Sequence, residues 1–249
     1  MYAPLMEFIR AAASDTDFFC LQEVFDSPES HALDWGGRAD IYKDLRAALP
    51  DFTPFFDVAV ENFDGDLTVD FPLSHGNAIF AKKDIAILSH GGFFLAGEDW
   101  QGPGTSQISP HKLQYVRFEK HGTAYALANV HGIAYPGAKT DTPERIAQSQ
   151  KIIDFLADET GEKILGGDFN LLPDTESIRM IERAGMRDLI TDFGISATRN
   201  QLSYGRYPEA ERQYFADFAF VSPAIRVTEF QVPPMEISDH LPLVLTCEL

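Results

Sequence analysis

Residues 163–170, KILGGDFN, join the end of an apolar run to two glycines, a carboxylic acid and an amide. The run KIL is typical of a short buried strand, and the glycines allow the backbone to turn tightly directly after it. Asp168 and Asn170 are two positions apart, so their side chains can face the same side. A carboxylate there can accept a proton from water, while the neighbouring amide holds the water or a phosphate oxygen. The alternative is that both side chains only cap the following turn.

Polar side chains recur at the ends of other apolar runs. They are Glu23 after FFCL, Asn129 and His131 at the end of TAYALANV, Asp217 at the start of DFAFV, and Asp239 and His240 before PLVLTC. Open α/β folds bind ligands at strand ends along one rim of a sheet. The recurrence therefore predicts one site assembled from several strands.

The triplet SDH at residues 238–240 places an acid beside an imidazole. An imidazole can donate to a phosphoryl oxygen, and it needs a carboxylate behind it to fix its orientation. Asp217 is a candidate for that carboxylate. A surface-loop role for His240 and a purely structural role for His131 remain as alternatives. The other histidines are expected to be surface or loop residues: His31, His75, His90, His111 and His121.

The order of apolar runs predicts a layered α/β or α+β fold in a single domain, residues 1–249. Strands are expected at residues 17–25, 77–81, 113–118, 123–130, 163–165, 218–221 and 243–246. Helices are expected near residues 5–12, from Thr142-Pro143 onward, and at residues 174–184. Ile146, Ile153 and Leu156 should form the buried face of the second helix. Long loops are expected at residues 26–40, 97–111 and 200–212.

Charge and cysteine content narrow the class of protein. The 38 acidic and 20 basic residues give a formal charge of −18, which disfavours tight binding to nucleic acid without excluding a nuclease. Cys20 and Cys247 are expected to be buried free thiols. The sequence has no signal-peptide pattern and no apolar run long enough for a membrane span, which predicts a cytoplasmic protein. A small-molecule partner is favoured, and the sequence indicates no protein partner.

Six short motifs together resemble the endonuclease/exonuclease/phosphatase superfamily. In order, over residues 17–245, they are LQEVF, HGNAIFAKK, LANVHG, GGDFN, DFAFVS and SDHLPL. The resemblance implies a four-layer α/β sandwich, with two mixed β-sheets packed face to face and helices outside. It also implies a divalent-metal-dependent hydrolase of phosphate esters. Carboxylate and amide oxygens suit Mg²⁺ or Mn²⁺ better than a structural zinc ion.

The resemblance further implies a role for each motif residue. Glu23 would be the principal metal ligand with Asp239 next to the metal, Asp168 would orient or deprotonate water, and Asn170 would bind the phosphate or the water. Asp217 would hold His240 against the scissile phosphate, and His131 would assist it. Substrate-binding residues are expected to be Asn77, Asn129, Arg199 and Tyr204, the last two in a segment where arginines alternate with tyrosines.

One departure from the family is expected to matter. Relatives open with a strand that carries an asparagine near the metal, and this sequence starts at the helix that follows it. If the chain is truncated there, rather than a true variant or a chain with a wrongly assigned start, one sheet edge should be exposed and metal binding weakened. A protein that keeps the fold but only binds a phosphate ligand or a partner therefore remains the alternative to an enzyme.

Overall fold

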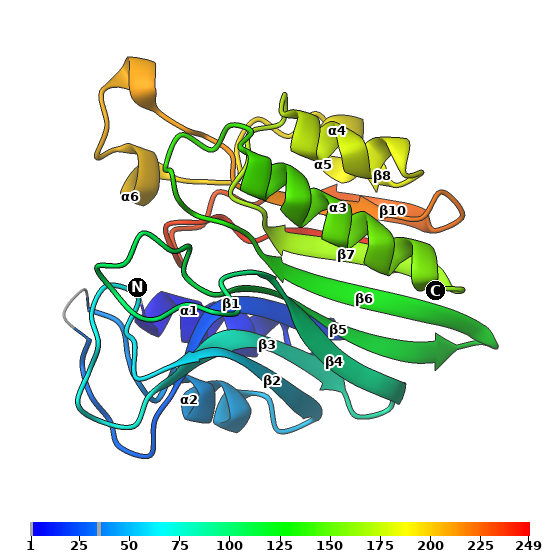
Figure 1. The fold of residues 1–249 in the computed structure, drawn as a ribbon. Coiled ribbons are helices and arrows are strands. Elements are labelled where there is room, and N and C mark those ends of the chain that lie inside the picture. The colour runs from blue at the N-terminus through cyan, green and yellow to red at the C-terminus, as the bar shows by residue number, and fades with distance from the viewer. Residues whose placement is uncertain (1, 34–35) are drawn as a thin grey trace.

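A six-stranded mixed β-sheet runs through the middle of the molecule (Figure 1), in a computed structural model that describes residues 2–33 and 36–249. The strand order is β4-β5-β6-β7-β9-β8. The strands are β4 (Ala86–Ala96), β5 (His111–Lys120), β6 (Thr123–His131), β7 (Glu162–Asp168), β8 (Arg187–Asp188) and β9 (Asp217–Val221). β6 and β7 pair in parallel, whereas the other neighbours are antiparallel.

A second β-layer faces this sheet and is divided into two antiparallel parts (Figure 1). The first part has the order β1-β3-β2 and consists of β1 (Phe18–Asp26), β2 (Phe52–Glu61) and β3 (Ser74–Lys82). The second part is the hairpin of β10 (Arg226–Gln231) and β11 (Val244–Glu248). Within the described residues, β1 pairs only with β3, and β11 pairs only with β10. Each therefore has one edge without a partner strand.

Helices cover the outer faces of both layers (Figure 1). α1 (Tyr2–Ala12) and α2 (Ile41–Ala48) bury Met6, Ile9 and Leu45 against Phe80 of β3. α3 (Pro143–Asp158) and α4 (Glu176–Arg183) cover the six-stranded sheet, and their Ile152, Leu156, Ile178 and Ile181 join the main core. The remaining helices are short: α5 (Leu189–Asp192), α6 (Gln201–Tyr204) and the 3₁₀ turn η1 (Glu209–Glu211). The layers are thus helix, sheet, sheet, helix, which confirms the predicted fold class.

Every strand and helix predicted from the sequence is present, and several unpredicted elements complete the layers. β2 contains Pro54, and β4 contains Gly91 and Gly92. Proline and glycine are unfavourable inside strands, so the local sequence argues against both elements. Both are edge strands, where such residues are tolerated because one side needs no ladder hydrogen bonds. α2 and β10 were also missed. The predicted loop 200–212 contains α6 and η1, and residues 34–35 of the predicted loop 26–40 lie outside the described residues.

The buried face of α3 was predicted correctly for Leu156 and wrongly for Ile146 and Ile153. It consists of Arg145, Gln148, Ser149, Ile152 and Leu156, whereas Ile146 and Ile153 are only partly buried. A polar contact determines which side of the helix is buried. The Gln148 Oε1 atom accepts from the backbone N–H of Ile133 at 2.8 Å, so the helix directs this side chain inward. Cys20 and Cys247 are free, as predicted, but partly rather than fully buried. No helix among the described residues is long and apolar enough to cross a membrane.

Arg145 organises the loop between β6 and α3. Its side chain is 0% exposed, and its guanidinium donates to four backbone carbonyls of this loop. The acceptors, with their shortest distances, are Ile133 (3.1 Å), Ala134 (3.2 Å), Pro136 (2.7 Å) and Thr140 (2.7 Å). A buried charge is tolerated here because every carbonyl that it meets is a strong acceptor. Residues 132–142, here called the β6–α3 loop, are therefore held in one shape.

Replacing Arg145 by methionine should destabilise the protein by about 3 kcal/mol or more, since four backbone carbonyls of the loop lose a charged donor. The free energy of unfolding from urea titration measures this. Arg206→Met, at an exposed position, is the matched control and should change stability by less than about 0.5 kcal/mol. Equal, small effects for both variants would contradict the role given to Arg145.

Candidate active site

Three polar side chains lie in one row across adjacent strands of the central sheet. The β6–β7 register pairs His131 with Asp168, and the β7–β9 register pairs Asp168 with Asp217. The row stands at the end of β6 and β7 and at the start of β9, so one rim of the sheet carries all three. The predicted assembly of a site from several strand ends is thus realised for these residues.

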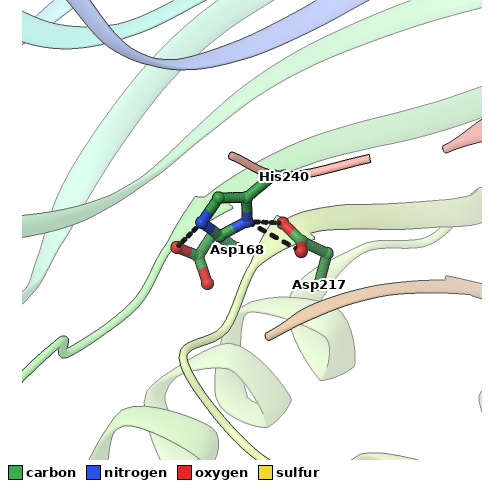
Figure 2. Close-up of side chains that lie close together, drawn as sticks. All are labelled: Asp168, Asp217 and His240. Carbon is green, nitrogen blue, oxygen red and sulfur yellow. Dashed lines mark hydrogen bonds and ion pairs between the residues drawn. The ribbon is translucent and has the colours of Figure 1, made fainter. Parts of the chain in front are cut away.

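His240 reaches the same rim from a distant part of the chain. A β-bridge between Arg199 and His240, and a bond from the Leu241 N–H to the Thr198 carbonyl at 2.8 Å, hold its backbone. The His240 ring lies between two carboxylates (Figure 2): its Nδ1 is 2.8 Å from Asp217 Oδ2, and its Nε2 is 4.0 Å from Asp168 Oδ2. Asp217 therefore orients the imidazole, as the sequence predicted.

The pair of His240 and Asp217 is an ion pair at neutral pH. Burial alone would lower the pKa of His240, but the negative charges of Asp217, Asp168 and Asp239 outweigh it and raise this pKa to about 10. The ligand atoms of Asp168, Asp217 and His240 all lie within 4.8 Å of one another, a spacing that could suit a metal ion. A protonated imidazole has no free lone pair, however, so this trio is better suited to proton transfer and anion binding than to metal ligation.

The turn after β7 fixes Asp168 from its own side. Gly167 has a φ of +133°, and a Cβ there would lie 2.2 Å from the Val130 carbonyl oxygen, so this position requires glycine. Asp168 Oδ1 accepts from the Asn170 N–H at 2.8 Å, and its Oδ2 accepts from the Asn170 side-chain amide at 3.1 Å. The turn-capping role that was the alternative for this motif is therefore real. It also leaves Asp168 in one fixed orientation.

Glu23 lies in a bulge of β1 beside His131. The register of β1 shifts between Leu21 and Val24, and Glu23 has a φ of +52°, a left-handed conformation that costs a non-glycine residue about 1–3 kcal/mol. Its side chain is 65% exposed, and its Oε1 is 3.5 Å from the His131 Nε2. The bulge thus holds an exposed carboxylate at the rim of the site.

Over residues 2–240 the sequence matches the endonuclease/exonuclease/phosphatase family. The chain belongs to that family. No protein of curated function matches it significantly in sequence. The family groups enzymes that hydrolyse phosphate esters, so phosphoester hydrolysis is the activity that the family assignment supports.

Solved structures share the fold at low sequence identity. An endonuclease/exonuclease/phosphatase from Bacteroides vulgatus is 18% identical, with a TM-score of 0.68, over 99% of this chain and 90% of that one. A mannosyl-6-phosphatase from Bacteroides thetaiotaomicron is 20% identical (TM-score 0.65, coverage 99% and 91%). D. rerio TDP2, complexed with a single-strand DNA product, is 14% identical (TM-score 0.65, coverage 99% and 92%).

Asn77 and Asn129, both predicted to bind substrate, are buried and use their side-chain amides within the protein. They are 1% and 0% exposed. The Asn77 amide donates to the carbonyls of Lys112 and Asn129, at 3.3 and 3.4 Å. The Asn129 amide donates to the Leu21 carbonyl at 3.0 Å and accepts from the Gln22 side chain. Both residues therefore join the two β-layers beneath the site and position the strands that carry His131 and Glu23.

His75 and His111 were wrongly expected at the surface. They lie in β3 and β5, with ring centroids 6.5 and 5.2 Å from that of His131. Burial, reinforced by repulsion from His131, lowers the pKa of His75 to about 3 and that of His111 well below its ordinary value. Both rings are thus neutral and pack around His131. His75 is the first residue of the HGNAIFAKK motif, and this position was the sequence signal that could have placed it near the site.

Arg199, Tyr204 and Asp239 lie in the segments that carry His240. An Arg199 Nη2 atom is 3.9 Å from Asp239 Oδ2, which places this cation beside His240. The Tyr204 ring packs on the Tyr214 ring of the same segment, with centroids 4.8 Å apart. The three mutually close ligand atoms belong to Asp168, Asp217 and His240, and neither Glu23 nor Asp239 is in this group.

Lys139 is a site residue that the sequence did not reveal. It is 6% exposed and lies in the β6–α3 loop, where its Nζ donates to the Asn170 Oδ1 atom. A lysine in a polar loop is ordinarily exposed, and nothing in GAKTD marks this one as buried. Only the fold of the loop around Arg145 brings it to the GGDFN turn.

The pKa of His240 predicts a pH-dependent stability in the presence of a chelator. Its folded pKa of about 10 lies above the ~6.5 of an unfolded histidine, so the ion pair stabilises fully below about pH 6.5 and is lost as pH rises through 10. Relative to His240→Gln, the parent should lose about 4 kcal/mol between pH 6 and pH 10 in urea unfolding. His121→Asn, at an exposed turn, should show no such difference from the parent. A difference in the free energy of unfolding between the parent and His240→Gln that does not change with pH would refute the ion pair.

Proposed function

We propose that this protein is a divalent-metal-dependent hydrolase of phosphate esters. The observation that carries the proposal is a carboxylate, Asp168, fixed 4.0 Å from the protonated ring of His240 on one sheet rim. A base and a cationic acid at this spacing suit the attack of water on phosphorus.

Each residue of the row has a distinct task in this mechanism. Asp168 accepts a proton from the attacking water, whose oxygen forms the new bond to phosphorus. The His240 Nε2–H, held by Asp217, donates to a phosphoryl oxygen as negative charge develops there. His131, beside Glu23, protonates or stabilises the ester oxygen as its bond to phosphorus breaks.

The available oxygen donors suit Mg²⁺ or Mn²⁺. Mg²⁺ keeps several waters and needs only one or two carboxylates from the protein. Glu23 is exposed at the rim, and Asp239 is adjacent to His240, so these two would hold the ion. When bound, such an ion would supply Lewis-acid chemistry that neutralises phosphoryl charge. His131 and the Asp217–His240 pair keep their imidazole roles and need not ligate it.

A small phosphate ester is favoured over nucleic acid as substrate. The formal charge of −18 repels a polyanion at long range, whereas a small ester needs only the local charges of the site. The relatives of similar fold include a mannosyl-6-phosphatase and a TDP2 bound to a single-strand DNA product, so fold alone does not separate the two substrate classes. The substrate proposal therefore rests on charge.

The activity itself provides the first test. With Mg²⁺ or Mn²⁺, the protein should hydrolyse p-nitrophenyl phosphate or bis-p-nitrophenyl phosphate, and Asp168→Asn should lower kcat by on the order of 10²–10⁴ because the base is lost. Asp158→Asn, exposed at the end of α3, is the control and should retain full activity. Full turnover in Asp168→Asn, or turnover in the presence of a chelator, would contradict the mechanism. No turnover with either ester would favour the non-catalytic alternative.

Glu23→Gly tests the metal assignment separately from turnover. In the parent, Mg²⁺ or Mn²⁺ should raise the melting temperature by linkage, and the variant should lose this rise. Because glycine accepts the +52° φ without strain, the metal-free variant should also be more stable than Glu23→Ala by about 1 kcal/mol. Glu23→Ala is the matched control, since it removes the carboxylate but keeps the strain. A metal-induced rise that is unchanged in both variants means that Glu23 is not a ligand.

A further inference from the structure

The GGDFN turn contacts a buried cation whose hydrogen-bonding capacity is only partly used. The Lys139 backbone is fixed: its carbonyl accepts from the Leu172 N–H at 2.9 Å, and the neighbouring Gly137 carbonyl accepts from the Gln213 side chain at 2.8 Å. Its φ of +54° is a left-handed conformation that a lysine rarely adopts. The ammonium group is thus held at the turn by the loop around it.

Asn170 has no donor left for a substrate. Its amide nitrogen carries two hydrogens, and these go to the Gly132 carbonyl at 2.9 Å and to Asp168 Oδ2 at 3.1 Å. Its oxygen accepts from Lys139. An incoming phosphoryl oxygen would have to break one of these bonds to reach the Asn170 amide. The expected role of Asn170 as a phosphate ligand therefore passes to a neighbour.

Lys139 has the donors that Asn170 lacks. An ammonium carries three hydrogens, and Asn170 Oδ1 is the one side-chain or backbone acceptor found for Lys139 Nζ among the described residues. Two hydrogens remain for another acceptor. A buried ammonium with unused donors costs free energy unless an anion or water completes its shell. Burial lowers the pKa of Lys139, and the charge of Arg199 adds to this effect while that of Asp168 opposes it.

Arg199 has an unused donor close to the same place. Its Nε is buried and has no hydrogen-bond partner among the described residues, although an Nη2 atom is 3.9 Å from Asp239. Arg199 and Asp168 both lie within electrostatic reach of Lys139, since the charge of each affects the pKa of its ammonium group. Lys139 thus lies near a second cation with an unused donor and near the carboxylate that would activate water.

We propose that Lys139 and Arg199 bind the terminal phosphoryl group of a phosphomonoester and so select monoesters over diesters. The inference rests on the proposed function and deepens it. A monoester phosphate has three non-bridging oxygens and up to two negative charges, whereas a diester has two such oxygens and one charge. His240 serves the reacting oxygen, so two further cations match the additional oxygen and charge of the monoester.

The first experiment compares two anions by isothermal titration calorimetry, with and without Mg²⁺. Inorganic phosphate carries the monoester charge, and dimethyl phosphate carries the diester charge. Lys139→Met and Arg199→Met should each weaken phosphate binding by on the order of 10- to 100-fold, with little change for dimethyl phosphate. Lys43→Met, exposed on α2, should change neither. Equal losses for both anions, no loss, or no phosphate binding by the parent would each overturn the inference.

Kinetics on the metal-loaded enzyme then test selection directly. The ratio of kcat/KM for p-nitrophenyl phosphate to that for bis-p-nitrophenyl phosphate should fall by about the same factor in Lys139→Met. A parent without turnover whose phosphate binding still depends on Lys139 would leave the phosphate site standing and refute the hydrolase. If the parent has turnover and its preference between the two esters is unchanged in Lys139→Met, the hydrolase stands and the phosphate site is refuted.

A double-mutant cycle separates direct contact from positioning. If Lys139 acted only by orienting Asn170, Lys139→Met would have no further effect on phosphate affinity in an Asn170→Ala background. A direct contact predicts that the loss persists in that background. Matching circular dichroism spectra for all variants exclude misfolding as the cause. Disappearance of the effect in the Asn170→Ala background would overturn the assignment of Lys139 as a phosphate ligand.

Discussion

The parallel pairing of β6 with β7, with β9 antiparallel on the far side, is the constraint on which the site depends. Strand pairing sets which residues are neighbours, and a slip of one residue would turn every side chain to the opposite face. The observed register brings His131, Asp168 and Asp217 into one row. The Val130 carbonyl approaches so closely that Gly167 alone fits opposite it. Once this register is set, the remaining site residues have a fixed frame to join.

A set of buried polar side chains supports that frame from below and from the side. Asn77 and Asn129 connect the two β-layers beneath the site, and Arg145 holds the β6–α3 loop beside it. Each of these side chains bonds mainly to backbone groups, which must find partners when they are buried. Polar residues thus occupy core positions where apolar ones would leave the irregular loop backbone unsatisfied. The same arrangement explains why α3 turns Gln148 inward.

The charge of the whole chain and the charge of the site have opposite tendencies. The molecule is strongly acidic, yet His240 lies 4.0 Å from Asp168, Lys139 contacts the adjoining turn, and Arg199 lies within electrostatic reach of Lys139. Interactions between buried charges are screened less than those at the surface, so in our proposal these cations govern what binds at the rim. The long-range field acts on approach and disfavours polyanions. The compact, doubly charged ester that we propose as substrate suits both the long-range field and the local cations.

The sequence by itself determined the layered α/β class, most strands and the members of the row, because apolar periodicity and strand-end polar residues are local signals. It also indicated the Asp217–His240 pair through motif order. Only the tertiary structure decided that Asn77 and Asn129 face the interior, that His75 and His111 surround His131, and that Lys139 reaches Asn170. These outcomes depend on sheet packing and on a loop shaped by Arg145, contacts between residues far apart in sequence. Local patterns carry no information about such contacts, whereas the folded chain fixes them through hydrogen bonds that buried backbone groups must make.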